Sequence, residues 1–71
     1  MREKLDALAT EMFDRGIRLE DALREMERRF INRALQSCDG SIGEAAGRLG
    51  IHRNTLSRKI EEYKLHRRRN T

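Results

Sequence analysis

The chain has 71 residues, of which 39% are charged and 37% hydrophobic. It is therefore expected to form one small domain whose small core needs a cross-link or a partner for stability. Its one cysteine, Cys38, excludes an internal disulfide, the two histidines lack the spacing of a zinc site, and no apolar run is long enough to cross a membrane. The net charge of +4 is unevenly placed: residues 1–40 carry −1 and residues 41–71 carry +5, which predicts that the C-terminal part meets a polyanion.

The first forty residues predict two helices. The absence of proline and the few aromatic residues favour an all-α fold. A first helix is expected over residues 2–15, ended by Gly16, and a longer helix over residues 19–37, ended by Asp39-Gly40. The longer helix carries two apolar clusters about a quarter to a third of a turn apart. We expect the later cluster to support the C-terminal helices; it consists of Ile31, Ala34, Leu35 and Cys38.

The remaining apolar side chains of this half predict an interface with a second copy of the chain. A hairpin of two amphipathic helices would leave them in water, and burying each one is worth roughly 1.5–3 kcal/mol. A two-fold dimer is therefore expected. The alternative is that the first helix folds back over the core of its own chain. The expected interface residues are Leu5, Leu8, Met12, Phe13, Leu19, Leu23, Met26 and Phe30.

Residues 41–65 have the pattern of a helix-turn-helix. Ser41 is a good N-cap, and Glu44 is placed to complete a capping box. Gly50 interrupts the helical spacing where a positive φ would let the chain turn sharply. A second helix over residues 53–63 should follow, and such a helix lies in the DNA major groove. The inward residues of the two helices are Ile42, Ala45, Ala46, Leu49, Ile51, Leu56, Ile60 and Tyr63.

The outward side of the second helix is the predicted DNA contact. Recognition helices present their N-terminal residues to base edges, where Arg suits guanine and Asn suits adenine, although both also bind phosphate. Steps of 100° per residue give four groove candidates, which are Arg53, Asn54, Ser57 and Arg58.

Other residues of this region are expected at the DNA backbone. Thr55 and Lys59 flank the groove candidates, and His52 is a poor N-cap, so the amides at this helix start should be free for a phosphate. Sequence-independent attraction should come from basic residues outside the helix. These are Arg48 and, in the flexible basic tail of residues 66–71, Arg67, Arg68 and Arg69. The alternative to DNA contact is that this helix face is simply exposed to solvent and that the tail only increases solubility.

Several short pieces of residues 30–65 match a known domain: Ala45-Ala46, Leu49-Gly50-Ile51, Arg53-Asn54-Thr55-Leu56, Arg58-Lys59-Ile60 and Tyr63. Through them the chain resembles the bacterial Fis family, a domain shared with NtrC-type transcriptional activators. The resemblance implies four helices per subunit and an intertwined homodimer that reads DNA largely by shape and deformability. The positions that match the family's DNA contacts are His52, Arg53, Thr55 and Arg58.

The chain also departs from the family's pattern. Glu61 and Glu62 replace basic residues of Fis, which argues against extensive wrapping of flanking DNA. Lys64 stands where many members have glycine, so the end of the last helix is expected to differ.

These observations predict a homodimeric, sequence-preferring protein that binds double-stranded DNA in the bacterial cytoplasm, as a transcriptional regulator or a nucleoid-associated protein. One alternative is the DNA-binding domain of a larger NtrC-type activator. Another is a helical dimerisation adaptor that binds an acidic protein and uses its helix-turn-helix only as scaffold. No nucleophile–base set, metal site or phosphate loop is recognisable, so we expect no enzyme activity, cofactor, small-molecule substrate or membrane partner.

Overall fold

The computed structural model describes residues 1–65, so the basic tail with Arg67, Arg68 and Arg69 lies outside the described residues. The described part of the chain contains only helices: α1 (Arg2–Asp14), α2 (Leu19–Ser37), α3 (Ile42–Leu49) and α4 (Arg53–Tyr63). The predicted all-α fold class is confirmed, and every helix ends within one residue of its expected position. None of these four helices is both long and apolar enough to span a membrane.

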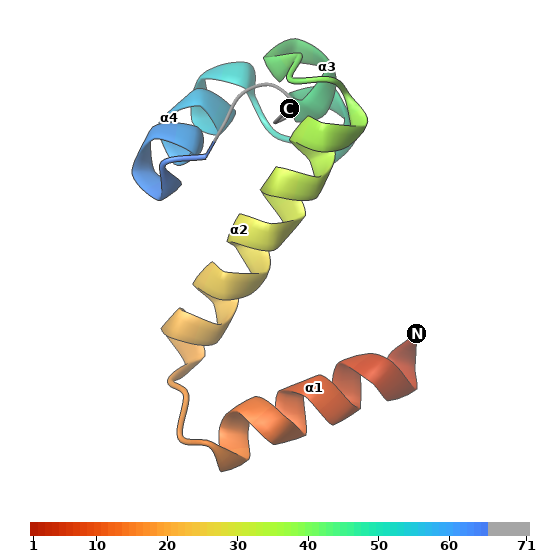
Figure 1. Cartoon of the computed structure of the whole chain (residues 1–71), viewed down its shortest axis with the longest axis vertical. Coiled ribbons are helices and arrows are strands. Elements are labelled where there is room, and N and C mark those ends of the chain that lie inside the picture. The colour runs from red at the N-terminus through yellow and green to blue at the C-terminus, as the bar shows by residue number, and fades with distance from the viewer. Residues whose placement is uncertain (66–71) are drawn as a thin grey trace.

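The long helix α2 connects two separate parts of the molecule. Figure 1 shows α1 diverging from the N-terminal end of α2, while α3 and α4 gather at its C-terminal end. The turn between α1 and α2 passes through Gly16, whose φ of 82° is easily adopted only by a residue without a Cβ. The helix-turn-helix is therefore attached to one half of α2 only.

The hydrophobic core lies where α3 and α4 meet the C-terminal half of α2. Leu35 and Leu56 are its largest fully buried side chains. The small side chains of Ala45 and Ala46 let α3 approach α2 closely, and both are buried. The later apolar cluster of α2 thus supports the helix-turn-helix, as predicted. The buried residues of the described range 1–65 are Ile31, Leu35, Cys38, Ala45, Ala46, Leu56 and Ile60.

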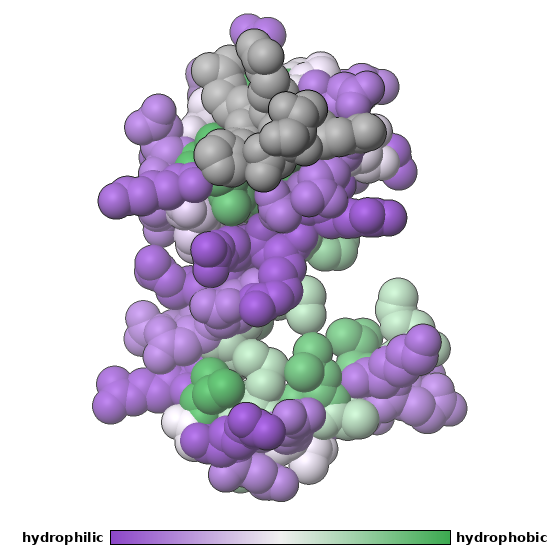
Figure 2. All heavy atoms as spheres, viewed as in Figure 1, coloured by the Kyte–Doolittle hydropathy of each residue, from purple (hydrophilic) through white to green (hydrophobic). Residues whose placement is uncertain are grey.

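Within residues 1–65, the half formed by α1 and the start of α2 has no core of its own. No residue of α1 is buried, and α2 is buried only at Ile31 and Leu35. The alternative in which the first helix covers the core of its own chain is therefore not what the structure shows. Figure 2 shows hydrophobic surface gathered where α1 faces the N-terminal half of α2.

Local hydrogen bonds define the start and the end of α3. Ser41 Oγ accepts a hydrogen bond from the backbone N–H of Glu44 at 3.3 Å, which confirms the predicted N-cap. The N–H of Ser41 donates to the carbonyl of Cys38 at 3.0 Å, so it is not free for the Glu44 side chain and only one arm of the capping box forms. Gly50 ends the helix in the left-handed conformation, with φ 74° and ψ 28°, as expected.

Lys64 ends α4 with the same left-handed geometry that glycine would adopt, at φ 56° and ψ 45°. The different helix end expected for this lysine is therefore not found, because the chain accepts the strain of a Cβ in this region instead. Replacing Lys64 with glycine should raise the free energy of unfolding by about 0.5–1 kcal/mol. Urea denaturation measures this change. Lys64→Ala removes the same charge but keeps the Cβ, so equal stability of the two variants would contradict the strain.

Candidate nucleic-acid interface

The rotation of α4 about its axis follows from its buried residues. Leu56 is completely buried and Ile60 is 4% exposed, and both belong to the same cluster as Leu35 of α2. The opposite side of α4 must therefore face solvent. Of the seven residues predicted to touch DNA in this helix-turn-helix, four are exposed: His52, Arg53, Asn54 and Arg58. The other three, Thr55, Ser57 and Lys59, are half-buried.

Two guanidinium groups dominate this outward side. Arg53 lies in the first turn of α4 and Arg58 in the second. Neither forms an ion pair with another residue in the range 1–65, whereas Arg15, Arg24 and Arg29 are paired with carboxylates. An exposed, unneutralised guanidinium is the group best suited to bind phosphate or the edge of guanine.

His52 acts as the N-cap of α4, which the sequence interpretation got wrong. Its Nδ1 accepts a hydrogen bond from the backbone N–H of Asn54 at 3.0 Å. The extended backbone of His52, with φ −72° and ψ 146°, suits this capping geometry. The amides at this helix start are therefore not all free for a phosphate. In a neutral imidazole that accepts through Nδ1, the proton lies on Nε2, which is left as a donor.

Arg48 lies at the end of α3 and is exposed. Its Nη1 donates to Ser37 Oγ at 3.3 Å, which links the last turn of α3 to the last residue of α2. A guanidinium has five N–H donors, so this one bond leaves others for a DNA phosphate.

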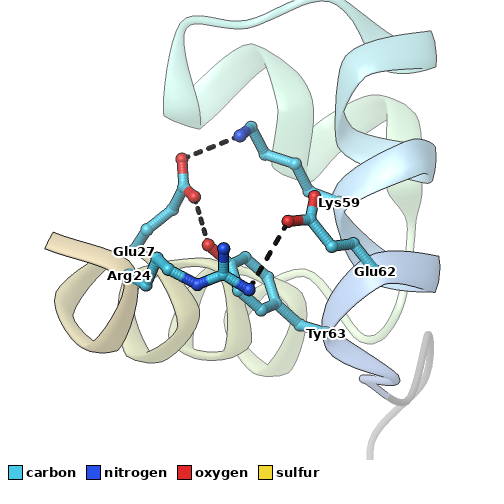
Figure 3. Close-up of polar contacts among 5 residues, drawn as sticks. All are labelled: Arg24, Glu27, Lys59, Glu62 and Tyr63. Carbon is cyan, nitrogen blue, oxygen red and sulfur yellow. Dashed lines mark hydrogen bonds and ion pairs between the residues drawn. The ribbon is translucent and has the colours of Figure 1, made fainter. Parts of the chain in front are cut away.

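Lys59 turns toward α2 rather than toward the outward side. Its Nζ lies 3.0 Å from Glu27 Oε2, and its side chain is only 25% exposed. The hydroxyl of Tyr63, one turn further along α4, donates to the other oxygen of Glu27 at 2.5 Å. Figure 3 shows both groups converging on this one carboxylate from the same helix.

A second ion pair lies beside the first. Arg24 Nη2 is 3.9 Å from Glu62 Oε2, and its guanidinium carbon is 5.9 Å from the centre of the Tyr63 ring. We call the five residues of Figure 3 the α2–α4 clasp: Arg24, Glu27, Lys59, Glu62 and Tyr63. The ammonium group that was expected at the DNA backbone is thus engaged within the subunit. Sequence reasoning missed Glu27, although an inward tyrosine is itself a signal that a hydrogen-bond partner should be sought.

The clasp changes the protonation of two of its members. The hydrogen bond from Tyr63, followed by the ion pair with Lys59, lowers the pKa of Glu27 below its ordinary 4.5. The same hydrogen bond raises the pKa of Tyr63 above its ordinary 10.0. A lowered carboxylate pKa adds stability above the unfolded value, and this stability is lost as the pH falls through the folded value. A raised phenol pKa adds stability below 10.0, and this is lost as the pH rises through the folded value.

We therefore expect Glu27→Gln to lower the free energy of unfolding at neutral pH and to leave it unchanged in acid. The variant should be less stable than the parent by a few tenths to about 1 kcal/mol at neutral pH, since the pair is partly exposed. The difference should vanish as the pH falls below 4.5 and through the lowered pKa of Glu27. Thermal unfolding of both proteins across this range measures it. A difference that persists unchanged in acid would mean that the Glu27 carboxylate contributes nothing by its charge.

Comparison with known proteins identifies the family. The sequence model described as bacterial regulatory protein, Fis family, matches residues 22–63, more than half of the chain. This match covers α3, α4 and nearly all of α2. No solved structure is similar enough to count as a match.

Curated proteins share the similarity. The chain is 49% identical over 43 residues to a protein of Xylella fastidiosa strain Temecula1, and 46% identical over 43 residues to one of strain 9a5c. Both are named as Fis-like DNA-binding proteins, and the match spans 61% of this chain but only 48% of each relative. It is also 44% identical over 45 residues to a limonene hydroxylase of Geobacillus stearothermophilus, a match that spans 63% of this chain and 8% of that protein.

Proposed function

This chain belongs to the Fis family of bacterial regulatory proteins, and on that premise we propose that it acts as a homodimer whose two α4 helices enter successive major grooves of one DNA duplex. The observation that carries the proposal is the outward side of α4. There Arg53 and Arg58 are exposed and unpaired within residues 1–65, while the opposite side is locked into the core by Leu56 and Ile60.

The proposed contacts divide into two classes. Arg53, Asn54 and Arg58 are exposed on α4, so we assign them to base edges and to the phosphates that flank them. His52 and Arg48 lie at the ends of the two helices and are assigned to phosphates. Thr55 and Ser57 are half-buried, so they contribute through their hydroxyls only where the DNA approaches closely. Lys59 is assigned to the clasp, and the arginines of the tail stay predictions.

The apolar surface of α1 and of the first half of α2 supports the dimer. Phe13 is 80% exposed in the single subunit, Leu19 75% and Leu23 60%. Two open grooves lie along α2, one lined by Leu8 and Met12 and the other by Leu23 and Phe30. Burying each such side chain is worth roughly 1.5–3 kcal/mol. A second copy provides the same apolar helices, and its two-fold axis gives each dimer two recognition helices.

The charge distribution agrees with a dimer surface in residues 1–40 and a DNA-binding surface in residues 41–71. Residues 1–40 carry a net charge of −1, so they have no electrostatic reason to approach DNA, whereas residues 41–71 carry +5. The same interface would serve a transcriptional regulator, a nucleoid-associated protein or the DNA-binding part of a larger activator.

Selection from a pool of random duplexes at several salt concentrations tests the proposal. We expect a selected site with two half-sites related by two-fold symmetry, because the protein is proposed to bind as a symmetric dimer. The affinity should fall steeply as the salt concentration rises, because phosphate contacts release counterions. Weak binding without any selected sequence would contradict the proposal and favour an adaptor for an acidic protein instead.

A further inference from the structure

The helix α2 takes part in both halves of the proposed function. Its early residues Leu19, Leu23 and Met26 are exposed on the proposed dimer surface, and its later residues Ile31 and Leu35 are buried beneath the helix-turn-helix. The angle at which α4 lies on α2 therefore determines where each recognition helix stands relative to the two-fold axis. A small change in this angle is doubled in the dimer, because both subunits change alike.

Directional contacts add to what the apolar core does for this angle. Leu56 and Ile60 bury α4, but hydrophobic contacts have no preferred direction. Hydrogen bonds and ion pairs do have a preferred geometry, and such contacts connect α2 directly to the last two turns of α4. Glu27 holds α4 at two points one turn apart, since one carboxylate oxygen meets Lys59 and the other meets Tyr63.

The order of charges in the clasp specifies one orientation. Along α2 a cation, Arg24, precedes an anion, Glu27, and along α4 a cation, Lys59, precedes an anion, Glu62. The observed packing pairs Arg24 with Glu62 and Glu27 with Lys59. Turning α4 end for end would bring the two cations together and the two anions together, which repel.

We propose that the α2–α4 clasp, centred on Glu27, is a positioning device that sets the separation of the two recognition helices and thereby the half-site spacing that the dimer prefers. This inference rests on the proposed function. Like an ordinary surface residue, Glu27 lies beside exposed residues of α2. Unlike one, it has a side chain of α4 bonded to each of its two carboxylate oxygens. It acts through Lys59 and Tyr63 and is assigned no contact with DNA.

The experiment uses the duplex that the parent protein selects, with one or two base pairs added or removed between the half-sites. The parent should bind the selected spacing best. In Glu27→Gln the ratio of affinities between the selected and the altered spacings should shrink about threefold to tenfold, the effect of losing a charged hydrogen bond. Tyr63→Phe should shrink the ratio less, because it keeps the ring beside Arg24 and the ion pair of Lys59.

Glu25→Gln is the matched control. It removes the same charge from the same helix, but among residues 1–65 Glu25 pairs with Arg29 of α2 itself and with no residue of α4, so the spacing preference should stay that of the parent. If Glu27→Gln and Tyr63→Phe lower the thermal stability yet keep the parent's preference, the clasp only stabilises the fold and the inference fails. If the parent selects no pair of half-sites, the proposed function itself fails, and the two failures are thus distinguishable.

Discussion

Replacing Leu23 with aspartate is expected to separate the proposed dimer into monomers that still fold. Leu23 is 60% exposed in the single subunit, so a carboxylate there leaves the core around Leu35 and Leu56 untouched. In the dimer the same carboxylate would be buried without a partner, which costs about 3–5 kcal/mol. The dimer dissociation constant should therefore rise at least about a hundredfold. Analytical ultracentrifugation measures the change, and circular dichroism checks that the helices remain.

The affinity for DNA should also fall in the Leu23→Asp variant, because a single subunit offers only one recognition helix. Ala7→Asp is the control: it puts the same group on the side of α1 that faces away from Leu5 and Leu8, and it should leave the dimer intact. A Leu23→Asp protein that sediments like the parent would show that this surface is not the dimer interface.

Replacing Arg53 with alanine is expected to have the largest effect on DNA recognition. Each lost groove contact costs about 1–3 kcal/mol and relaxes the base preference at its position. The loss occurs twice in a dimer, so the total effect on affinity is about twice as large in free energy. Arg58→Ala tests the second guanidinium, and a pure phosphate contact would weaken all sequences alike and reduce the salt dependence. Fluorescence anisotropy with selected and random duplexes distinguishes these cases.

Arg15→Ala is the matched control for the loss of one positive charge. Arg15 is the C-cap of α1 and pairs with Glu11. The turn that follows α1 lies at the opposite end of the molecule from α4 (Figure 1). The substitution should change the affinity for DNA little and the sequence preference not at all. Unchanged DNA binding in both Arg53→Ala and Arg58→Ala would remove the assignment of the DNA-contacting side.

The helices and the core could be predicted because their signals are local. The spacing of Leu56 and Ile60 requires an inward side of α4, and the structure buries both residues. Gly50 is the residue that a sharp turn with positive φ requires, and its φ is 74°. The later cluster of α2, with Ile31 and Leu35, is likewise where periodicity placed it.

Sequence reasoning missed contacts whose partners lie beyond the reach of a helical pattern. Lys59 was expected at the DNA backbone because its position flanks the outward side, but its partner Glu27 is 32 residues away in the sequence. Periodicity describes which side of a helix is apolar and does not tell which charge meets which. The His52 cap was missed because histidine has low N-cap preference, and only the geometry of the turn reveals that Nδ1 reaches the amide of Asn54.

The central claim is that two copies join through α1 and α2 so that two α4 helices bind one duplex together. Sedimentation of the protein with its selected duplex, and with the same duplex after one half-site is scrambled, tests it most directly. We expect two chains per intact duplex at saturation, and a large loss of affinity when one half-site is scrambled. A complex of one chain per duplex that is indifferent to the second half-site would contradict the claim.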